Sequence, residues 1–263
     1  VARLAEMVRF LEYFDTERVV LLHVIGGGRI DAEKRRLDRL VQRLREELTG
    51  EAADIELHAV VTSGSPALRI AAEASAQDAD FIYFPWKHKS WIQRTLVGST
   101  TQDVIRLSDR PIFVFKPRAR WSEGDPFRIV YPTDFSDSDR FVIPYLRYKG
   151  LTADELSIIN VRERAPDPVA ERTQEEHCAA NLARLRDEVK DNYAEVYSEG
   201  LVGNPKRRIV RETRRRKAAL LVLGNAGGGR SLPAMMGSVA GSVAIAAPCS
   251  VLIIGENHHT LEK

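Results

Sequence analysis

The sequence predicts an α/β protein made of two similar domains, each a doubly wound parallel β-sheet with helices on both faces. Three observations support this prediction. Short apolar runs typical of buried strands alternate with amphipathic helical patterns along the whole chain. A polar segment with proline near both ends divides the chain near its middle. Glycine and proline motifs then recur at a fixed offset in the two halves, which indicates a tandem repeat.

The first half begins with a predicted amphipathic helix over residues 1–15, because Leu4, Val8 and Leu11 share one face between charged residues. Apolar or alternating runs predict the strands that follow, and Pro66 begins a helix after a glycine turn. The predicted strands are residues 19–25, 55–61, 81–84 and 112–115, and the predicted helices are residues 1–15, 31–49, 66–76 and 96–107.

Residues 117–126 are rich in charge and proline, and we interpret them as a linker between domains at residues 1–116 and 127–257. The alternation of strands and helices restarts after this linker. The predicted strands are residues 127–131, 156–161, 194–197, 220–223 and 251–254, and the predicted helices are residues 137–148, 169–189, a segment after Pro205, and residues 237–247.

The internal repeat has a constant offset. Gly64 and Gly203 are 139 positions apart, and the same offset separates Gly98 from Gly237. Nearer the N-terminus, His23-Val24 aligns with Asn160-Val161 at an offset of 137, so the counterpart of Asp134, and with it the first strand of this half, would lie before Val1. We therefore expect upstream residues, or another segment, to supply the first strand of the first half, because its neighbours would otherwise be left unpaired.

The composition is that of an ordinary soluble protein. The chain has 263 residues, 44% of them hydrophobic, which is enough for two ordinary cores, and its net charge of +2 gives no reason to expect a nucleic-acid partner. No window approaches the roughly 18 apolar residues that a membrane-spanning helix needs, and the charged first residues do not form a signal peptide. Cys178 and Cys249 have neither disulfide-framework nor zinc-site spacing. We therefore expect a cytoplasmic protein.

A glycine-rich segment between the last two predicted strands suits the binding of phosphate groups. The apolar strand that ends at Leu223 is followed by Gly224 and Gly227, and Gly237-Ser238 then precedes a helix. Glycine lets the backbone approach an anion closely, and the N–H groups at a helix N-terminus attract negative charge. A flexible turn without a ligand is the alternative interpretation, because a glycine cluster alone is a weak signal.

The spacing of these glycines resembles a known nucleotide-binding signature. It matches the pattern G-2x-G-9x-G-(S/T) of the universal stress protein family, and residues 247–254, APCSVLII, resemble the end of such a domain. The resemblance extends over essentially the whole chain. It implies two Rossmann-like domains of the adenine nucleotide α-hydrolase type, each with a five-stranded parallel sheet. Such domains commonly pair through their last strands, which implies an internal pseudo-dimer, with a homodimer as a further expectation.

The resemblance also implies a nucleotide site in the second half. Pro132-Thr133-Asp134 is similar to the family's strand-end P-x-D, in which the aspartate accepts hydrogen bonds from the nucleoside. Val161 would meet the base through its backbone. The residues that would hold the ribose and phosphates of ATP, with Mg²⁺ or Mn²⁺ as a candidate accompanying ion, are Gly224, Gly227, Gly237, Ser238 and Val239.

Asp134 has an alternative role as a helix N-cap, although Ser136 is an equally good cap for the same helix. The first half departs from the signature, because the offset places Pro85 and His88 where the second half has two of its glycines. Proline has no N–H to offer a phosphate. We therefore expect the first half to bind nucleotide poorly or not at all and to act as a partner surface for the second.

Two functions are consistent with these residues. The first is a universal stress protein that binds ATP, or a related adenine nucleotide, in its second domain and acts as a stress-response or regulatory sensor. No P-loop lysine follows the glycines, so the sequence offers no strong catalytic candidate, and slow ATP hydrolysis is the most that we consider. The alternative is a non-enzymatic interaction or regulatory module, for example the soluble part of a transporter, with a vestigial site.

Overall fold

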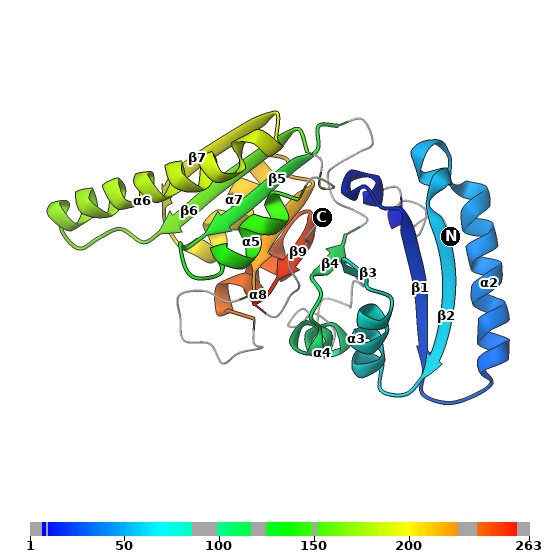
Figure 1. The fold of residues 1–263 in the computed structure, drawn as a ribbon. Coiled ribbons are helices and arrows are strands. Elements are labelled where there is room, and N and C mark those ends of the chain that lie inside the picture. Colours follow the sequence, from blue (N-terminus) through cyan, green and yellow to red (C-terminus); the bar gives the residue numbers. More distant parts are fainter. Residues whose placement is uncertain are drawn as a thin grey trace.

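The computed structural model describes residues 7–8, 10–85, 99–116, 125–148, 151, 153–225 and 236–256. The strands in these residues form a two-stranded sheet, β1-β2, and a seven-stranded sheet in the order β3-β4-β9-β8-β5-β6-β7 (Figure 1). The predicted linker lies mostly outside the described residues, as does the predicted site residue Gly227.

The second half contributes five strands, which are all parallel to one another. Its first strand, β5, lies between β6 and β8 and is therefore the central strand of this half. The elements are β5 (Arg128–Thr133), α5 (Asp139–Leu146), β6 (Glu155–Arg162), α6 (Pro168–Val189), η4 (Lys190–Asn192), β7 (Glu195–Val202), α7 (Pro205–Arg215), β8 (Leu220–Gly224), α8 (Ser238–Ala246) and β9 (Ser250–Ile254).

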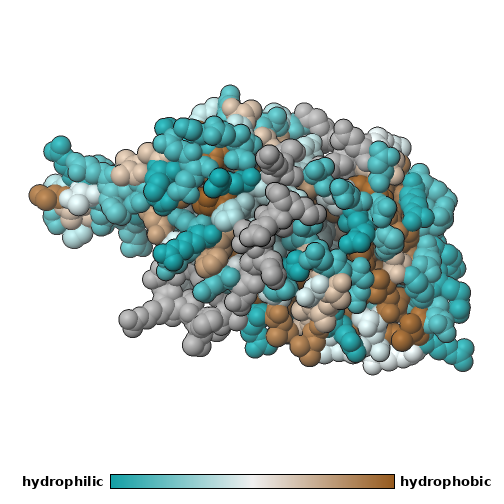
Figure 2. Space-filling model, viewed as in Figure 1, coloured by the Kyte–Doolittle hydropathy of each residue, from teal (hydrophilic) through white to brown (hydrophobic). Residues whose placement is uncertain are grey.

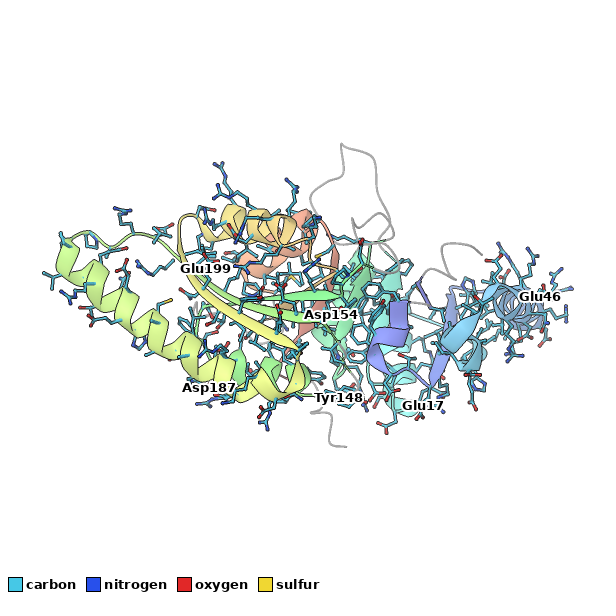
Figure 3. The ribbon with its side chains drawn as sticks, turned by 90° about the horizontal axis from the view of Figure 1, so that it is seen from above. Glu17, Glu46, Tyr148, Asp154, Asp187 and Glu199 are labelled. Carbon is cyan, nitrogen blue, oxygen red and sulfur yellow. The ribbon has the colours of Figure 1, made fainter. Side chains whose placement is uncertain are left out.

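Helices cover both faces of this sheet, as a doubly wound fold requires. Leu146 of α5 and Leu185 of α6 belong to one hydrophobic cluster, whereas Ile209 of α7 and Val243 of α8 belong to another. Figure 3 shows the sheet from above, with α6 and α7 on opposite sides of it. The alternation of side chains along each strand feeds these two clusters, because successive residues point to opposite faces.

The first half contributes four strands to the described residues, and they form two separate parallel pairs, β1 with β2 and β3 with β4. The counterparts of β1 and β3 in the second half, β6 and β8, both pair with β5. The elements are η1 (Leu11–Phe14), β1 (Arg18–Ile25), α2 (Ile30–Glu47), η2 (Gly50–Asp54), β2 (Glu56–Ser63), α3 (Pro66–Ala76), β3 (Ile82–Pro85), α4 (Ser99–Leu107) and β4 (Ile112–Phe115).

The tandem repeat is visible in single backbone angles. Gly64 and Gly203 both have positive φ, 133° and 146°, in the turns before α3 and α7. Asp78 and Lys217 are also 139 positions apart, and both take the left-handed conformation just after these helices, with φ of 49° and 52°. Such angles are rare in residues other than glycine, so their recurrence confirms the repeat predicted from the sequence.

The two halves are joined by their last strands. β4 pairs antiparallel with β9, with Phe113 opposite Leu252 at the centre of the ladder. Aromatic rings reinforce the junction, because Phe10 lies 5.5 Å from Phe113 of the first half and 5.3 Å from Phe127 of the second, measured between ring centroids. The predicted α/β fold with two domains in tandem is therefore confirmed, with this one antiparallel ladder in an otherwise parallel arrangement.

Several predicted elements differ from the observed ones. The helix predicted at residues 1–15 ends in a 3-10 helix, η1, at Leu11–Phe14, and the strand predicted at residues 55–61 continues to Ser63. The strand predicted at residues 194–197 continues to Val202, because all eight residues of β7 pair with β6. The helix predicted at residues 137–148 begins only at Asp139, because Phe135 takes a left-handed conformation, with φ of 58°, and a turn follows it.

The surface is mixed in character. Figure 2 shows hydrophilic residues over the outer side of α2 and hydrophobic residues exposed beside them. The strands β1 and β2 account for part of this exposure, since most of their side chains are only half-buried or exposed. In the part of the chain that the structure describes, no helix combines the length and apolar character needed to cross a membrane.

Gly200 packs so closely against α6 that a larger residue should destabilise the protein. A Cβ atom at this position would lie 2.8 Å from Sγ of the buried Cys178, whereas a Cβ at Gly26 would have no neighbour within 4 Å. We expect Gly200→Ala to lower the free energy of unfolding by about 1–3 kcal/mol in urea denaturation. Gly26→Ala is the matched control and should change it by less than about 1 kcal/mol.

Replacing Cys178 by alanine in the Gly200→Ala protein should recover part of the lost stability, because it removes the colliding sulfur atom. Equal effects of the two glycine substitutions would contradict this interpretation of the α6–β7 packing.

Candidate functional site

The carboxyl ends of three neighbouring strands, β8, β5 and β6, lie side by side in the seven-stranded sheet. Thr133 at the end of β5 pairs with Asn160 of β6, and Val130 of β5 pairs with Leu221 of β8. Asp134 follows Thr133 and Val161 follows Asn160, so both lie where the β5–β6 ladder ends. Asn225 follows β8, four residues beyond Leu221, the last residue of β8 that pairs with β5. The carboxyl edge of a parallel sheet next to its central strand is where such folds bind ligands.

The N-terminus of α8 is held against this edge by Asn225. The N–H of Gly237 donates to the carbonyl oxygen of Asn225 at 2.9 Å, and the N–H of Asn225 donates to the carbonyl oxygen of Ile254 at 2.6 Å. These bonds tie the two ends of the glycine-rich segment together. Residues 226–235 within the segment lie outside the described residues.

The start of α8 has the properties of an anion site. Gly237 is its N-cap residue and makes no side-chain capping hydrogen bond, and Ser238 is exposed. The first N–H groups of a helix have no acceptor within the helix, and they carry the positive end of the helix dipole. A phosphate group placed here would satisfy these groups and gain electrostatic stabilisation.

Asp134 does not cap the following helix. Its Oδ1 accepts a hydrogen bond from the N–H of Ser136 at 3.1 Å, within the turn, whereas α5 begins later, with Ser138 at the N-cap position. The alternative prediction that Asp134 or Ser136 is the N-cap residue of this helix is therefore wrong, because Ser138 occupies that position. The Asp134 side chain is exposed just after the end of β5.

A buried hydrogen-bond network stabilises the turn that contains Asp134. Asp139 Oδ1 accepts hydrogen bonds from Tyr131 Oη at 2.5 Å and from Thr133 Oγ1 at 2.7 Å, and Thr133 Oγ1 in turn accepts one from the N–H of Phe135 at 2.9 Å. Asp139 is only 8% exposed, and burial raises the pKa of its carboxyl group. The network fixes the path of the chain on both sides of Asp134.

Asn160 connects the ends of β5 and β6. Its Nδ2 donates to the carbonyl oxygen of Thr133 at 2.8 Å, and its Oδ1 accepts a weak hydrogen bond from Cys178 Sγ at 3.5 Å. Both groups are buried, so Val161 on the next position is held at a defined place on the edge. A polar residue near the end of an apolar strand was the available signal for Asn160, and the sequence prediction did not use it.

Most of the predicted site residues lie together at this edge. Those in the described part of the chain are Pro132, Thr133, Asp134, Val161, Gly224, Gly237, Ser238 and Val239. The Thr133 hydroxyl is committed to the buried network rather than directed at the edge. The prediction missed Asn225, Asp139 and Asn160, which position the site from beside or beneath it.

Two surface cavities lie beside this edge, one lined by Arg162, which follows Val161, and the other by Phe135 and Ser136, which follow Asp134. One, of about 450 Å³, lies between α6 and β7, and the other, of about 400 Å³, lies between α5 and α6; the predicted site residues line neither. Among the described residues, no group of three or more His, Cys, Asp or Glu side chains could hold a metal ion.

Comparison with known proteins supplies the family context. A sequence model described as the Universal stress protein family matches residues 7–116 and again residues 127–255. The structure is similar to that of a universal stress protein from Archaeoglobus fulgidus DSM 4304, with 23% sequence identity, a TM-score of 0.64, and coverage of 94% of this chain and 90% of that chain.

It is also similar to a functionally unknown protein from Pseudomonas aeruginosa PAO1, with 17% identity, a TM-score of 0.63, and coverage of 91% of this chain and 83% of that chain. At these identities the structural likeness supports the fold alone. No curated protein matches the chain in a sequence comparison.

The buried Asp139 should impose a pH dependence on stability. Because its pKa is raised in the folded protein, the folded state binds this proton more tightly than the unfolded state does. The free energy of unfolding of the wild type should therefore rise, relative to Asp139→Asn, as the pH falls through the folded-state pKa. Urea denaturation of both proteins between about pH 8 and about pH 4 would measure the difference.

Thr133→Val provides an internal comparison, because it removes one of the hydrogen bonds that favour the charged carboxylate. It should make the rise in stability at low pH larger than in the wild type. Parallel pH profiles for wild type and Asp139→Asn would show that the carboxyl group is not desolvated as the structure indicates.

Proposed function

The chain belongs to the universal stress protein family, and we propose that its second half binds ATP or a related adenine nucleotide at the carboxyl edge of the sheet. In this proposal the bound nucleotide is the signal of a stress-response or regulatory sensor. The observation that carries it is the hydrogen bond between Gly237 and Asn225, which holds the uncapped start of α8 at the end of β8, next to β5, the strand that Asp134 follows.

The phosphates would bind at the start of α8. The N–H groups of Ser238 and Val239 lie in its first turn, and no acidic residue is present in that turn to compete with an anion. Hydrogen bonds to a charged group contribute about 1.5–3 kcal/mol each, and the helix dipole adds roughly 0.3–1 kcal/mol. Mg²⁺ or Mn²⁺ would enter with the phosphates of ATP.

The nucleoside would lie over the ends of β5 and β6. The exposed carboxylate of Asp134 is an acceptor for the ribose hydroxyl groups, and the backbone of Val161 is available to the base. Asn225 supports this placement, because its Oδ1 is buried and has no hydrogen-bond partner among the described residues. A hydroxyl group of the ligand would satisfy such an acceptor, which is otherwise costly to bury.

The proposal predicts one nucleotide per chain and a dependence on Asp134. Titration calorimetry of ATP with the purified protein should give a stoichiometry near one, since only the second half carries the full glycine signature. Asp134→Ala should weaken ATP binding roughly 10- to 100-fold, the loss expected for one charged hydrogen-bond acceptor. Asp137→Ala is the matched control, because Asp137 is an exposed carboxylate in the same turn.

Equal affinities of wild type and Asp134→Ala would contradict the placement of the nucleoside. Absence of binding by the wild type up to about millimolar ATP, together with no rise in Tm with ligand, would contradict the function itself. The interpretation as an interaction module with a vestigial site would then be preferred.

A further inference from the structure

We infer that the first half of the chain completes the nucleotide site of the second half, because Lys116 holds the carboxyl end of α8 and thereby positions its phosphate-binding end. Lys116 follows β4 and is the last residue of the first family match. The inference rests on the proposed nucleotide site. It assigns Lys116 a positioning role, without contact to the nucleotide.

Lys116 reaches from one half into the other. Its Nζ donates hydrogen bonds to the carbonyl oxygens of Ala244 and Ala247, both at 2.8 Å, and a longer one to that of Ile245 at 3.3 Å. Its backbone N–H donates to Ser250 Oγ at 3.2 Å. Lys116 is 9% exposed, so these bonds form in a nearly dry environment.

The charge on Lys116 suits this location. The last carbonyl groups of a helix have no hydrogen-bond donor within the helix, and they carry the negative end of the helix dipole. A cation at this end of the helix is therefore favourable. Burial lowers the pKa of the ammonium group to about 8. The charged form therefore still predominates at neutral pH.

α8 needs external support because it is short and has a poor helix-forming sequence. It contains nine residues, SVAGSVAIA, including Gly241 and two serines. Isolated helices shorter than about 12–15 residues are marginal even with better sequences. Outside the helical ladder, α8 is hydrogen-bonded to Asn225 at its start and to Lys116 at its end, and Val243 and Ala244 pack in a hydrophobic cluster on one face of the sheet.

Disorder at the carboxyl end of α8 should also reduce the order of its N-terminal end. The helix has only about two and a half turns, and helix formation is cooperative over such a length. Without Lys116, the carbonyl groups of Ala244 and Ala247 would be buried without this donor. The first N–H groups of α8 would then be less well ordered for phosphate binding.

The repeat does not place a second lysine at the equivalent position of the second half. The residue 139 positions after Lys116 is Gly255, which has no side chain to reach α4, the counterpart of α8. The half that receives the lysine is thus the half that retains the glycine signature, whereas the half that donates it has Pro85 and His88 in the equivalent places. This asymmetry gives the degenerate half a function in the site of its twin.

The test compares ATP and adenosine binding in Lys116→Met. Because α8 would hold phosphates and not the nucleoside, we expect roughly tenfold weaker binding of ATP and a change of less than about twofold for adenosine. Leu44→Ala is the control for general destabilisation, since Leu44 is fully buried in the small core of α2, β1 and β2. It should leave both affinities unchanged in the folded protein.

A second measurement does not depend on nucleotide. The N–H groups of Gly237 and Gly241 donate to the carbonyl oxygens of Asn225 and Gly237 at the start of α8. Their amide hydrogen exchange in the free protein should be faster in Lys116→Met than in wild type and unchanged in Leu44→Ala. If Lys116→Met does not fold, Lys116→Gln, which keeps a donor amide on a shorter chain, takes its place with the same expectations.

Unchanged exchange at the start of α8 would overturn the inference, as would equal weakening of ATP and adenosine binding. Failure of the wild type to bind ATP is a different result, because it contradicts the proposed function while the exchange measurement still tests the role of Lys116.

Discussion

The antiparallel pairing of β4 with β9 is the constraint on which the arrangement of the molecule depends. Its ladder is short, from Ile112 opposite Ile253 to Val114 opposite Val251, yet every residue in it is buried. A pair such as β3–β4 is marginal as an isolated unit. The ladder makes it part of a seven-stranded sheet, and the two hydrophobic clusters on the faces of this sheet contain residues of both halves.

The strand pairing of the two halves is nevertheless unequal in the described part of the chain. In the second half β5 unites the sheet, whereas β1 and β2 form a pair of their own that packs against α2 through a small cluster around Leu44. Fewer buried contacts imply a lower free energy of local opening for this pair than for the seven-stranded sheet. The nucleotide site proposed here is built on the more extensively paired half.

Local sequence patterns predicted the repeat and most of the elements well. Pro66 and Pro205 begin α3 and α7 as their positions indicated, because proline fixes φ and needs no helical acceptor at the first turn. The full length of β7 was not predictable from alternation, because Ser198, Glu199 and Gly200 interrupt the apolar pattern. Pairing with β6 determines the strand there, and pairing depends on residues distant in sequence.

For the candidate site as well, some residues are predictable from local sequence, whereas others depend on contacts between distant parts of the chain. Spacing along the chain predicts the glycines and Asp134 as site residues, because a glycine-rich segment before a helix and a strand-end turn are local patterns. The supports of the site are not local. Asp139 acts through side chains on β5, and Lys116 contacts Ala244 from 128 positions away. A motif can therefore be retained in one half of a repeat while its structural support comes from the other, which would favour keeping a degenerate half attached to an intact one.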